Sequence, residues 1–133
     1  MTNCISPSGR SDHHYESVAW FDAQAVEGVR YAVARISLGR RIELARKMRE
    51  IGRKVEYLSA GDDAREKLEA AVVSAEIDRA YLEWGLAEVA GLSIDGETAT
   101  PASAIEKGPL KLAAEILARV KAEWSLSGDE RKN

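Results

Sequence analysis

The 133-residue sequence has few of the residues that usually carry catalysis, metal binding or disulfide chemistry. It contains one cysteine and two histidines, and all three lie near the N-terminus. A single cysteine, Cys4, cannot form an internal disulfide, which is typical of proteins from a reducing compartment. His13 and His14 are neighbours with no further ligand at a recognised spacing. We therefore expect no metal site and no cofactor.

Longer sequence patterns are missing as well. No apolar run reaches the roughly 18 residues that a transmembrane helix needs. The N-terminal segment is polar and lacks the charged-then-apolar order of a signal peptide. Phosphate-binding glycine motifs, the zinc-protease motif and paired C-x-x-C motifs do not occur. We expect a cytoplasmic protein that has no membrane span and is not an enzyme.

The composition that is present fits one globular domain. Hydrophobic residues make up 45% and charged residues 31% of the chain, which is ordinary for a domain of this length. Residues 1–17 are polar and are expected to form a flexible tail, so that the globular domain comprises residues 18–133. Basic residues are in excess in the first half and acidic residues in the second half. This asymmetry indicates contacts between helices or an acidic partner.

Apolar periodicity predicts three long helices, over residues 38–59, 63–90 and 109–125. The helix over 63–90 has apolar residues on two roughly opposite faces, which is typical of the middle of a bundle. The turn Ala60–Asp63 is expected to fold it back antiparallel to the preceding helix. A further short helix is expected after Pro101.

Two segments have the features of β-structure. Residues 29–35 alternate between apolar and polar or small side chains, which predicts a strand, and residues 18–21 are a candidate partner strand. Asp95 and Gly96 form a dipeptide that favours a tight hairpin turn. The predicted fold is therefore α+β and mainly α. It is a small bundle of three long helices with an N-terminal β-segment and a short Asp-Gly hairpin.

The predicted strand is a candidate partner-binding element, because an open strand edge can accept a strand from another chain. Its candidate contact residues are Val29, Tyr31 and Val33. Trp20 and Phe21 lie beside it at the boundary of the tail. An exposed aromatic pair is a common interface feature, and a buried pair is a common core feature, and both interpretations remain open here.

The helix over 38–59 carries a second candidate surface, which is basic. Its arginines are Arg40, Arg41, Arg46, Arg49 and Arg53. The last three lie opposite the apolar seam of the helix and should face solvent. This face is either solvated with internal ion pairs or a surface for phosphates. The chain is acidic overall and its aromatic residues are not interleaved with the arginines, so nucleic-acid binding is not expected.

The order of elements resembles a known class of small phage proteins. A polar tail and a β-segment precede a helix that opens Ser37-Leu-Gly-Arg-Arg-Ile-Glu-Leu44, and the segment Gly91-Leu-Ser-Ile-Asp-Gly-Glu-Thr-Ala-Thr-Pro101 leads into a later helix. Over residues 26–133 this pattern resembles the phage tail assembly chaperones. The resemblance implies a non-enzymatic assembly factor in the host cytoplasm. Such a factor binds the long tape-measure protein and recruits tail-tube subunits.

Two other functions remain open from the sequence. One is a structural component of the virion, either a head–tail connector or a tail completion protein. The other is a small nucleic-acid-binding regulator that uses the arginine-rich helix. Self-association is compatible with all three, because a helix that is apolar on two sides needs cover from the rest of the chain, from another copy or from another protein.

Overall fold

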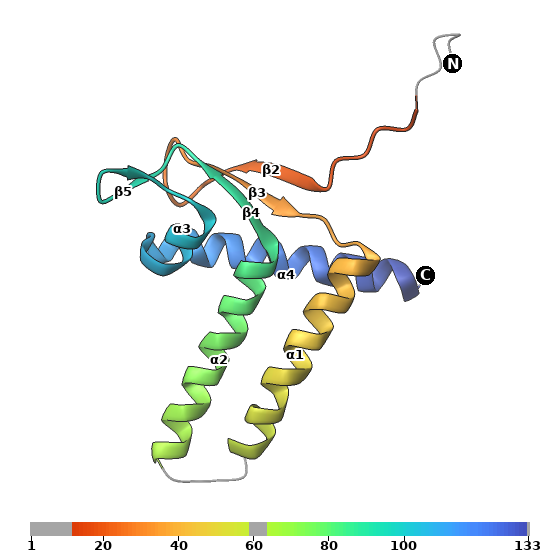
Figure 1. Cartoon of the computed structure of the whole chain (residues 1–133), viewed down its shortest axis with the longest axis vertical. Coiled ribbons are helices and arrows are strands. Elements are labelled where there is room, and N and C mark those ends of the chain that lie inside the picture. Colours follow the sequence, from red (N-terminus) through yellow and green to blue (C-terminus); the bar gives the residue numbers. More distant parts are fainter. Residues whose placement is uncertain (1–11, 59–63, 133) are drawn as a thin grey trace.

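The computed structural model describes residues 12–58 and 64–132, and Figure 1 shows their arrangement. The predicted turn Ala60–Asp63 and the first 11 residues of the predicted tail lie outside this range. In chain order the elements are β2 (Val18–Asp22), β3 (Arg30–Ala34), α1 (Leu38–Leu58), α2 (Ala64–Gly85), β4 (Leu86–Ala90), β5 (Ser93–Ile94), β6 (Glu97–Thr98), α3 (Pro101–Lys107) and α4 (Leu110–Lys132).

Strands β2, β3 and β4 form an antiparallel sheet with β3 in the centre. Trp20 lies opposite Ala32 in the β2–β3 pair, and Phe21 lies opposite Tyr31, which in turn lies opposite Val89 of β4. Because side chains alternate between the faces of a sheet, Phe21, Tyr31 and Val89 share one face. Helix α4 runs beneath the sheet and contacts β3 (Figure 1).

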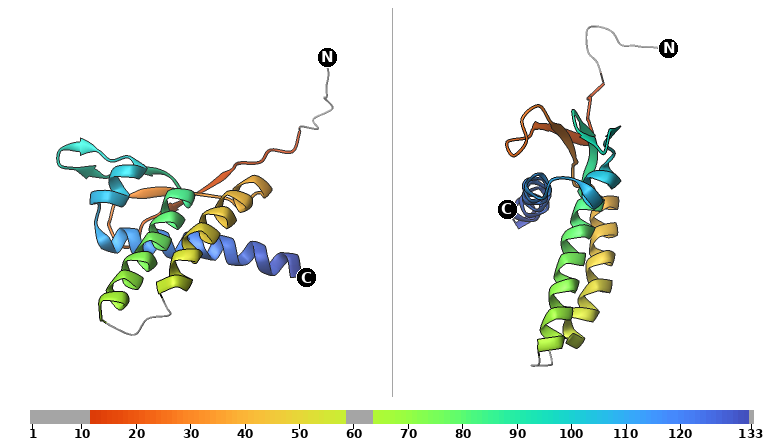
Figure 2. Two further views of the ribbon diagram at one scale, coloured as in Figure 1. Left: turned by 60° about the horizontal axis from the view of Figure 1, so that its bottom comes forward. Right: turned by 90° about the vertical axis from the view of Figure 1, so that its left-hand side faces the viewer.

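Helices α1 and α2 form a long hairpin that projects from the sheet, as the right-hand view of Figure 2 shows. A small apolar cluster joins the two helices along the hairpin, with Ile51 of α1 against Val73 and Ala80 of α2. Ile51 and Leu44 both belong to the predicted apolar seam of α1, and both are buried, Ile51 in this cluster and Leu44 in the main core.

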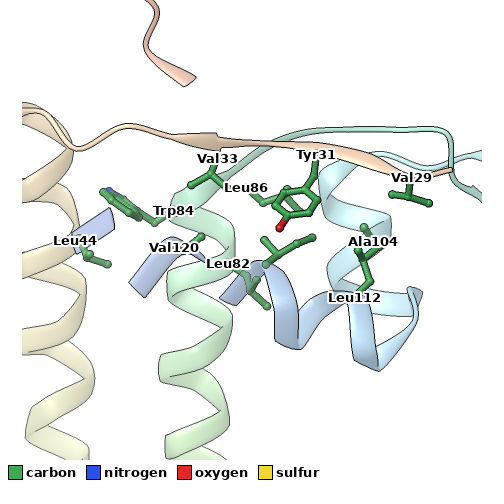
Figure 3. Close-up of a cluster of buried hydrophobic side chains, with 11 residues drawn as sticks. Val29, Tyr31, Val33, Leu44, Leu82, Trp84, Leu86, Ala104, Leu112 and Val120 are labelled. Atoms are coloured by element: carbon green, nitrogen blue, oxygen red, sulfur yellow. The ribbon is translucent and has the colours of Figure 1, made fainter. Parts of the chain in front are cut away.

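The main core lies where the sheet, α4 and the sheet-proximal ends of α1 and α2 meet (Figure 3). Its fully buried side chains are Tyr31, Leu44, Leu112, Ile116 and Val120. Tyr31 points down from the sheet into this cluster, toward Leu82 of α2. Burial of these apolar side chains is the main stabilising contribution of such a core.

The predicted bundle of three long helices with an N-terminal β-segment is wrong. The described residues form an α+β fold with four helices and two small sheets. The main error concerns the helix expected over 63–90, which ends at Gly85 and continues as strand β4. Gly85 is a poor helix former, and the absence of a Cβ there lets Val120 of α4 pack against the backbone. Beyond it, Leu86–Ala90 pairs with β3 and completes the sheet.

The other connections are closer to expectation. Asp95 and Gly96 both have positive φ and form the tight turn between β5 and β6, as the sequence predicts. Helix α3 begins at Pro101 with Thr100 as its cap, where the Thr100 Oγ1 atom accepts the Ser103 N–H at 3.1 Å. Helix α4 extends to Lys132, beyond the predicted end at residue 125. Among the described helices, none combines the length and the apolar character that a membrane span requires.

Candidate protein-binding site

The residues expected to bind a partner through the β3 segment are core residues. Val29, Tyr31 and Val33 are 2%, 0% and 3% exposed. Tyr31 and Val33 are buried because β3 is the central strand, so that both of its edges are paired and its inner face lies on α4, and Val29 directly precedes β3 in the same core. The expectation of an open edge at this strand is therefore corrected: the outer edges of the sheet belong to β2 and β4.

The two adjacent aromatic residues of β2 point to opposite faces of the sheet. Phe21 faces inward, where its ring lies 5.8 Å from that of Tyr31 and under the guanidinium of Arg119. Trp20 faces outward, is 37% exposed, and has the guanidinium of Arg30 5.2 Å from its ring centre. The core interpretation thus holds for Phe21, and only Trp20 offers surface to a partner.

The arginines of α1 do not form one continuous surface. Arg46, Arg49 and Arg53 are exposed, as the helical periodicity predicts. Arg40 and Arg41 are half-buried. The guanidinium of Arg40 lies 5.1 Å from the ring centre of Trp84 and 3.5 Å from a Glu43 carboxylate oxygen. Arg40 therefore has a structural role in anchoring the start of α1 to the end of α2.

A groove between α2, α3 and α4 has a volume of about 530 Å³ and a mainly apolar lining. Helices α2 and α4 supply most of its lining, and α3 contributes Ile105. The apolar residues that line it are Val72, Ala75, Leu82, Ile105, Leu110, Ala113, Ala114 and Leu117. Within α2 and within α4 these residues follow steps of three or four positions, so they lie on one face of each helix.

Large apolar side chains at this groove remain in contact with water. Leu110 is 84% and Val72 is 60% exposed. Leu68 lies one helical turn before Val72 on α2 and is 70% exposed, so it extends the apolar surface along the projecting hairpin. Single exposed apolar residues are normal, but a contiguous patch around a groove is typical of a binding surface.

Charged residues around the groove form ion pairs, two of which join neighbouring helices. Arg79 of α2 pairs with Glu83, at 3.1 Å, and with Glu106 of α3. Lys121 of α4 pairs with Asp78 of α2 at 3.4 Å. These contacts link α2 to α3 and to α4, and they pair charges beside the apolar floor of the groove. The groove was not among the predicted sites, although the apolar residues on two faces of α2 indicated a surface that needs cover.

A second hollow, of about 380 Å³, lies on the other side of α2, where the sheet meets the start of α1. Trp84 and Arg40 line it, together with Val18 and Arg35. The Nε1 atom of Trp84 donates to the Arg40 carbonyl at 2.8 Å, and its ring packs edge-on against Trp124. Trp84 is therefore held in place by its neighbours, whereas the buried Nε atom of Arg40 has no hydrogen-bond partner among the described residues.

A partly buried polar network ties the β2–β3 loop to α4. The Glu115 carboxylate accepts the N–H groups of Gln24 and Ala25 at 2.9 and 2.8 Å and the hydroxyl of Tyr31 at 2.8 Å. Burial acts to raise the pKa of Glu115, but these hydrogen bonds and the nearby Arg119 outweigh burial and lower the pKa below its usual value. Burial and the contact with Glu115 raise the pKa of Tyr31. Each group in this network already has a protein partner.

The described residues contain no group of three or more His, Cys, Asp or Glu side chains that could hold a metal ion. Comparison of the chain with models of protein families, with curated proteins and with solved structures found no match. Any functional assignment therefore depends on the surface of the molecule itself and on the sequence resemblance described above.

Proposed function

We propose that this protein is a non-enzymatic, protein-binding assembly factor, and that it binds a helix of its partner in the groove between α2, α3 and α4. The observation that carries this proposal is the apolar floor of the groove, with Val72 and Leu110 exposed beside it. A groove between packed helices is a common receptor for an amphipathic helix, whose apolar residues at i, i+3, i+4 and i+7 fill the hollow. Covering these side chains removes apolar surface from water, which favours binding.

The partner that we propose is a phage tape-measure protein, and the role is that of a tail assembly chaperone in the host cytoplasm. The resemblance of residues 26–133 to this class supports the assignment. A tape-measure protein is long and helical, so it presents apolar helical stripes that need cover until tail-tube subunits replace the chaperone. A groove that accepts one helical stripe suits this task, because release requires no covalent change.

The test is to measure binding between this protein and the tape-measure protein encoded beside it, for the wild type and for single-site variants. Leu110→Asp and Val72→Asp should each weaken binding by at least about tenfold, because each places a charge against the apolar stripe of the partner helix. Leu38→Asp is the matched control, since Leu38 is 74% exposed but does not line the groove.

The outcomes distinguish the alternatives. Equal affinities for all variants, or an equal loss in the Leu38→Asp control, would reject the groove as the binding site. Recovery of this chain in finished particles would favour a structural component of the virion. Capture of nucleic acid without a protein partner would instead favour a regulator that uses the exposed arginines of α1.

A further inference from the structure

Strand β2 leaves one edge of the three-stranded sheet open. The Arg35 N–H donates to the Ser17 carbonyl and the Ala23 N–H donates to the Val29 carbonyl, both at 2.8 Å. Main-chain groups in an antiparallel ladder alternate in direction, so the odd-numbered residues of β2 bond to β3 and the even-numbered ones face away. Within residues 12–58 and 64–132, no strand pairs with this outward side.

In the part of the chain that the structure describes, the outward side of β2 has little protection against pairing. Proteins usually block an open edge with proline, lysine, a bulge or a covering segment. The strand sequence Val-Ala-Trp-Phe-Asp contains no proline and no lysine, its only charged residue is the terminal Asp22, and its pairing with β3 is regular. The Nε atom of Arg35 reaches the outward carbonyl of Val18, but at a long distance of 3.5 Å. At the opposite edge, α3 contacts β4, and the β3–β4 register is irregular between Ala32 and Val33.

We propose that a second copy of this chain pairs with β2, forming an antiparallel β2–β2 ladder around a twofold axis at Trp20. The register follows from the direction of the outward groups. Trp20 lies opposite Trp20 of the partner subunit, and Val18 lies opposite Asp22 of the partner subunit. Every outward N–H and C=O group of Val18, Trp20 and Asp22 then meets a complementary group. The three-stranded sheets of the two copies become one continuous sheet.

Charge complementarity favours a second copy over an unrelated strand. The Asp22 carboxylate is 80% exposed and is bound on one side by Arg30 at 3.0 Å. In the proposed register, Asp22 lies opposite Val18 of the partner subunit, whose carbonyl is the group that Arg35 of the partner subunit reaches. The Asp22 carboxylate, already paired with Arg30 of its own copy, thus comes near a second guanidinium group from the other copy. The exposed rings of the two Trp20 residues cover each other at the axis.

Cysteine cross-linking tests both the contact and its register. In a Cys4→Ser background, Trp20→Cys should be joined to its counterpart by a short bifunctional thiol reagent, because paired Cα atoms in this ladder are about 5.5 Å apart. Asp22→Cys is the matched control. Its counterpart is displaced by four residues, which is about 14 Å along the strand, beyond the reach of such a reagent. Cross-linking of Asp22→Cys as fast as Trp20→Cys, or of neither, would overturn the proposal.

Sedimentation of the uncross-linked protein gives an independent measurement. The wild type should show a concentration-dependent dimer, and Trp20→Lys should raise its dissociation constant by at least about tenfold because like charges then face each other at the axis. Circular dichroism should show Trp20→Lys folded, since the side chain points away from the core. A wild-type protein that stays monomeric at every concentration, or a Trp20→Lys variant that dimerises equally well, would reject the ladder.

Discussion

The hydroxyl of Tyr31 donates a hydrogen bond to the carboxylate of Glu115 at 2.8 Å, although 84 positions separate the two residues in the sequence. Tyr31 stands at the centre of the sheet, and Glu115 lies on α4 beneath it. The same carboxylate accepts two main-chain N–H groups from the loop after β2. One side chain therefore holds the sheet, the loop and the helix together, which orients β2 and its open edge.

Replacement of Glu115 by glutamine should lower the free energy of unfolding by about 1–3 kcal/mol, because the amide side chain has one acceptor oxygen and no charge for three donors. Urea denaturation followed by circular dichroism measures this change. Glu97→Gln is the control, because Glu97 is an exposed residue of the β5–β6 hairpin. A loss of stability of the same size in both variants would contradict the role assigned to Glu115.

The contribution of Glu115 should depend on pH. The folded state lowers the pKa of this carboxyl, so its stabilising effect is complete above the unfolded pKa and is lost as the pH falls through the folded pKa. The melting temperatures of wild type and Glu115→Gln should therefore differ most near neutral pH and converge in acid. A difference that stays constant down to strongly acidic pH would show that the charge of Glu115 contributes nothing.

The Tyr31 hydroxyl should limit stability at the other end of the pH scale. Its pKa is raised above 10.0, so the folded state favours the neutral phenol. The contribution of the hydroxyl to the stability of the fold is therefore complete below that pH and is lost as the pH rises further. Tyr31→Phe keeps the ring in the core and removes the hydroxyl. Its melting temperature should fall less steeply than that of wild type under strongly alkaline conditions, and parallel curves would contradict this expectation.

Local sequence signals predicted some parts of the fold and were ambiguous in others. The alternation in residues 29–35 and the Asp95-Gly96 dipeptide each correspond to observed β-structure, because both signals act over a few residues. Strand β4 was missed because Leu82, Leu86 and Val89 also follow helical steps of three and four. Pairing with β3 and packing on α4 decide between the two conformations, and neither contact is visible in a single segment.

The helix-to-strand junction makes this tertiary effect measurable. A Cβ atom at Gly85 would lie 2.5 Å from a Val120 methyl carbon, and Val120 is 0% exposed. Gly85→Ala should therefore destabilise the fold by about 1–3 kcal/mol through overpacking. In the double variant Gly85→Ala/Val120→Ala the cost should be less than the sum of the single changes. Strict additivity in the four unfolding free energies would show that the two positions are not in contact.

The candidate groove was only partly predictable for a related reason. The apolar residues on two faces of α2 indicated that the helix needs cover on both sides. The structure shows that Val73 packs toward α1 while Val72 remains exposed beside the groove. Adjacent residues on a helix point about 100° apart, so small differences in orientation decide which one is buried. The sequence alone does not determine that orientation, because it depends on where α4 lies.

The arginines of α1 allow a final test of that helix's orientation and of the nucleic-acid alternative. Replacing Arg46, Arg49 and Arg53 together by glutamate should preserve the circular dichroism spectrum, because all three side chains are exposed and substitutions at such sites usually change stability by about 0.5 kcal/mol or less each. Arg40→Glu, with the same change of charge at one half-buried site, should instead lower the melting temperature, since Arg40 stacks on Trp84 and pairs with Glu43.

We expect no salt-dependent DNA binding by the wild type. If wild type binds DNA and the triple variant does not, the arginine face has a function that the groove does not explain. If the triple variant unfolds, these side chains are packed in solution and α1 is rotated from the orientation described.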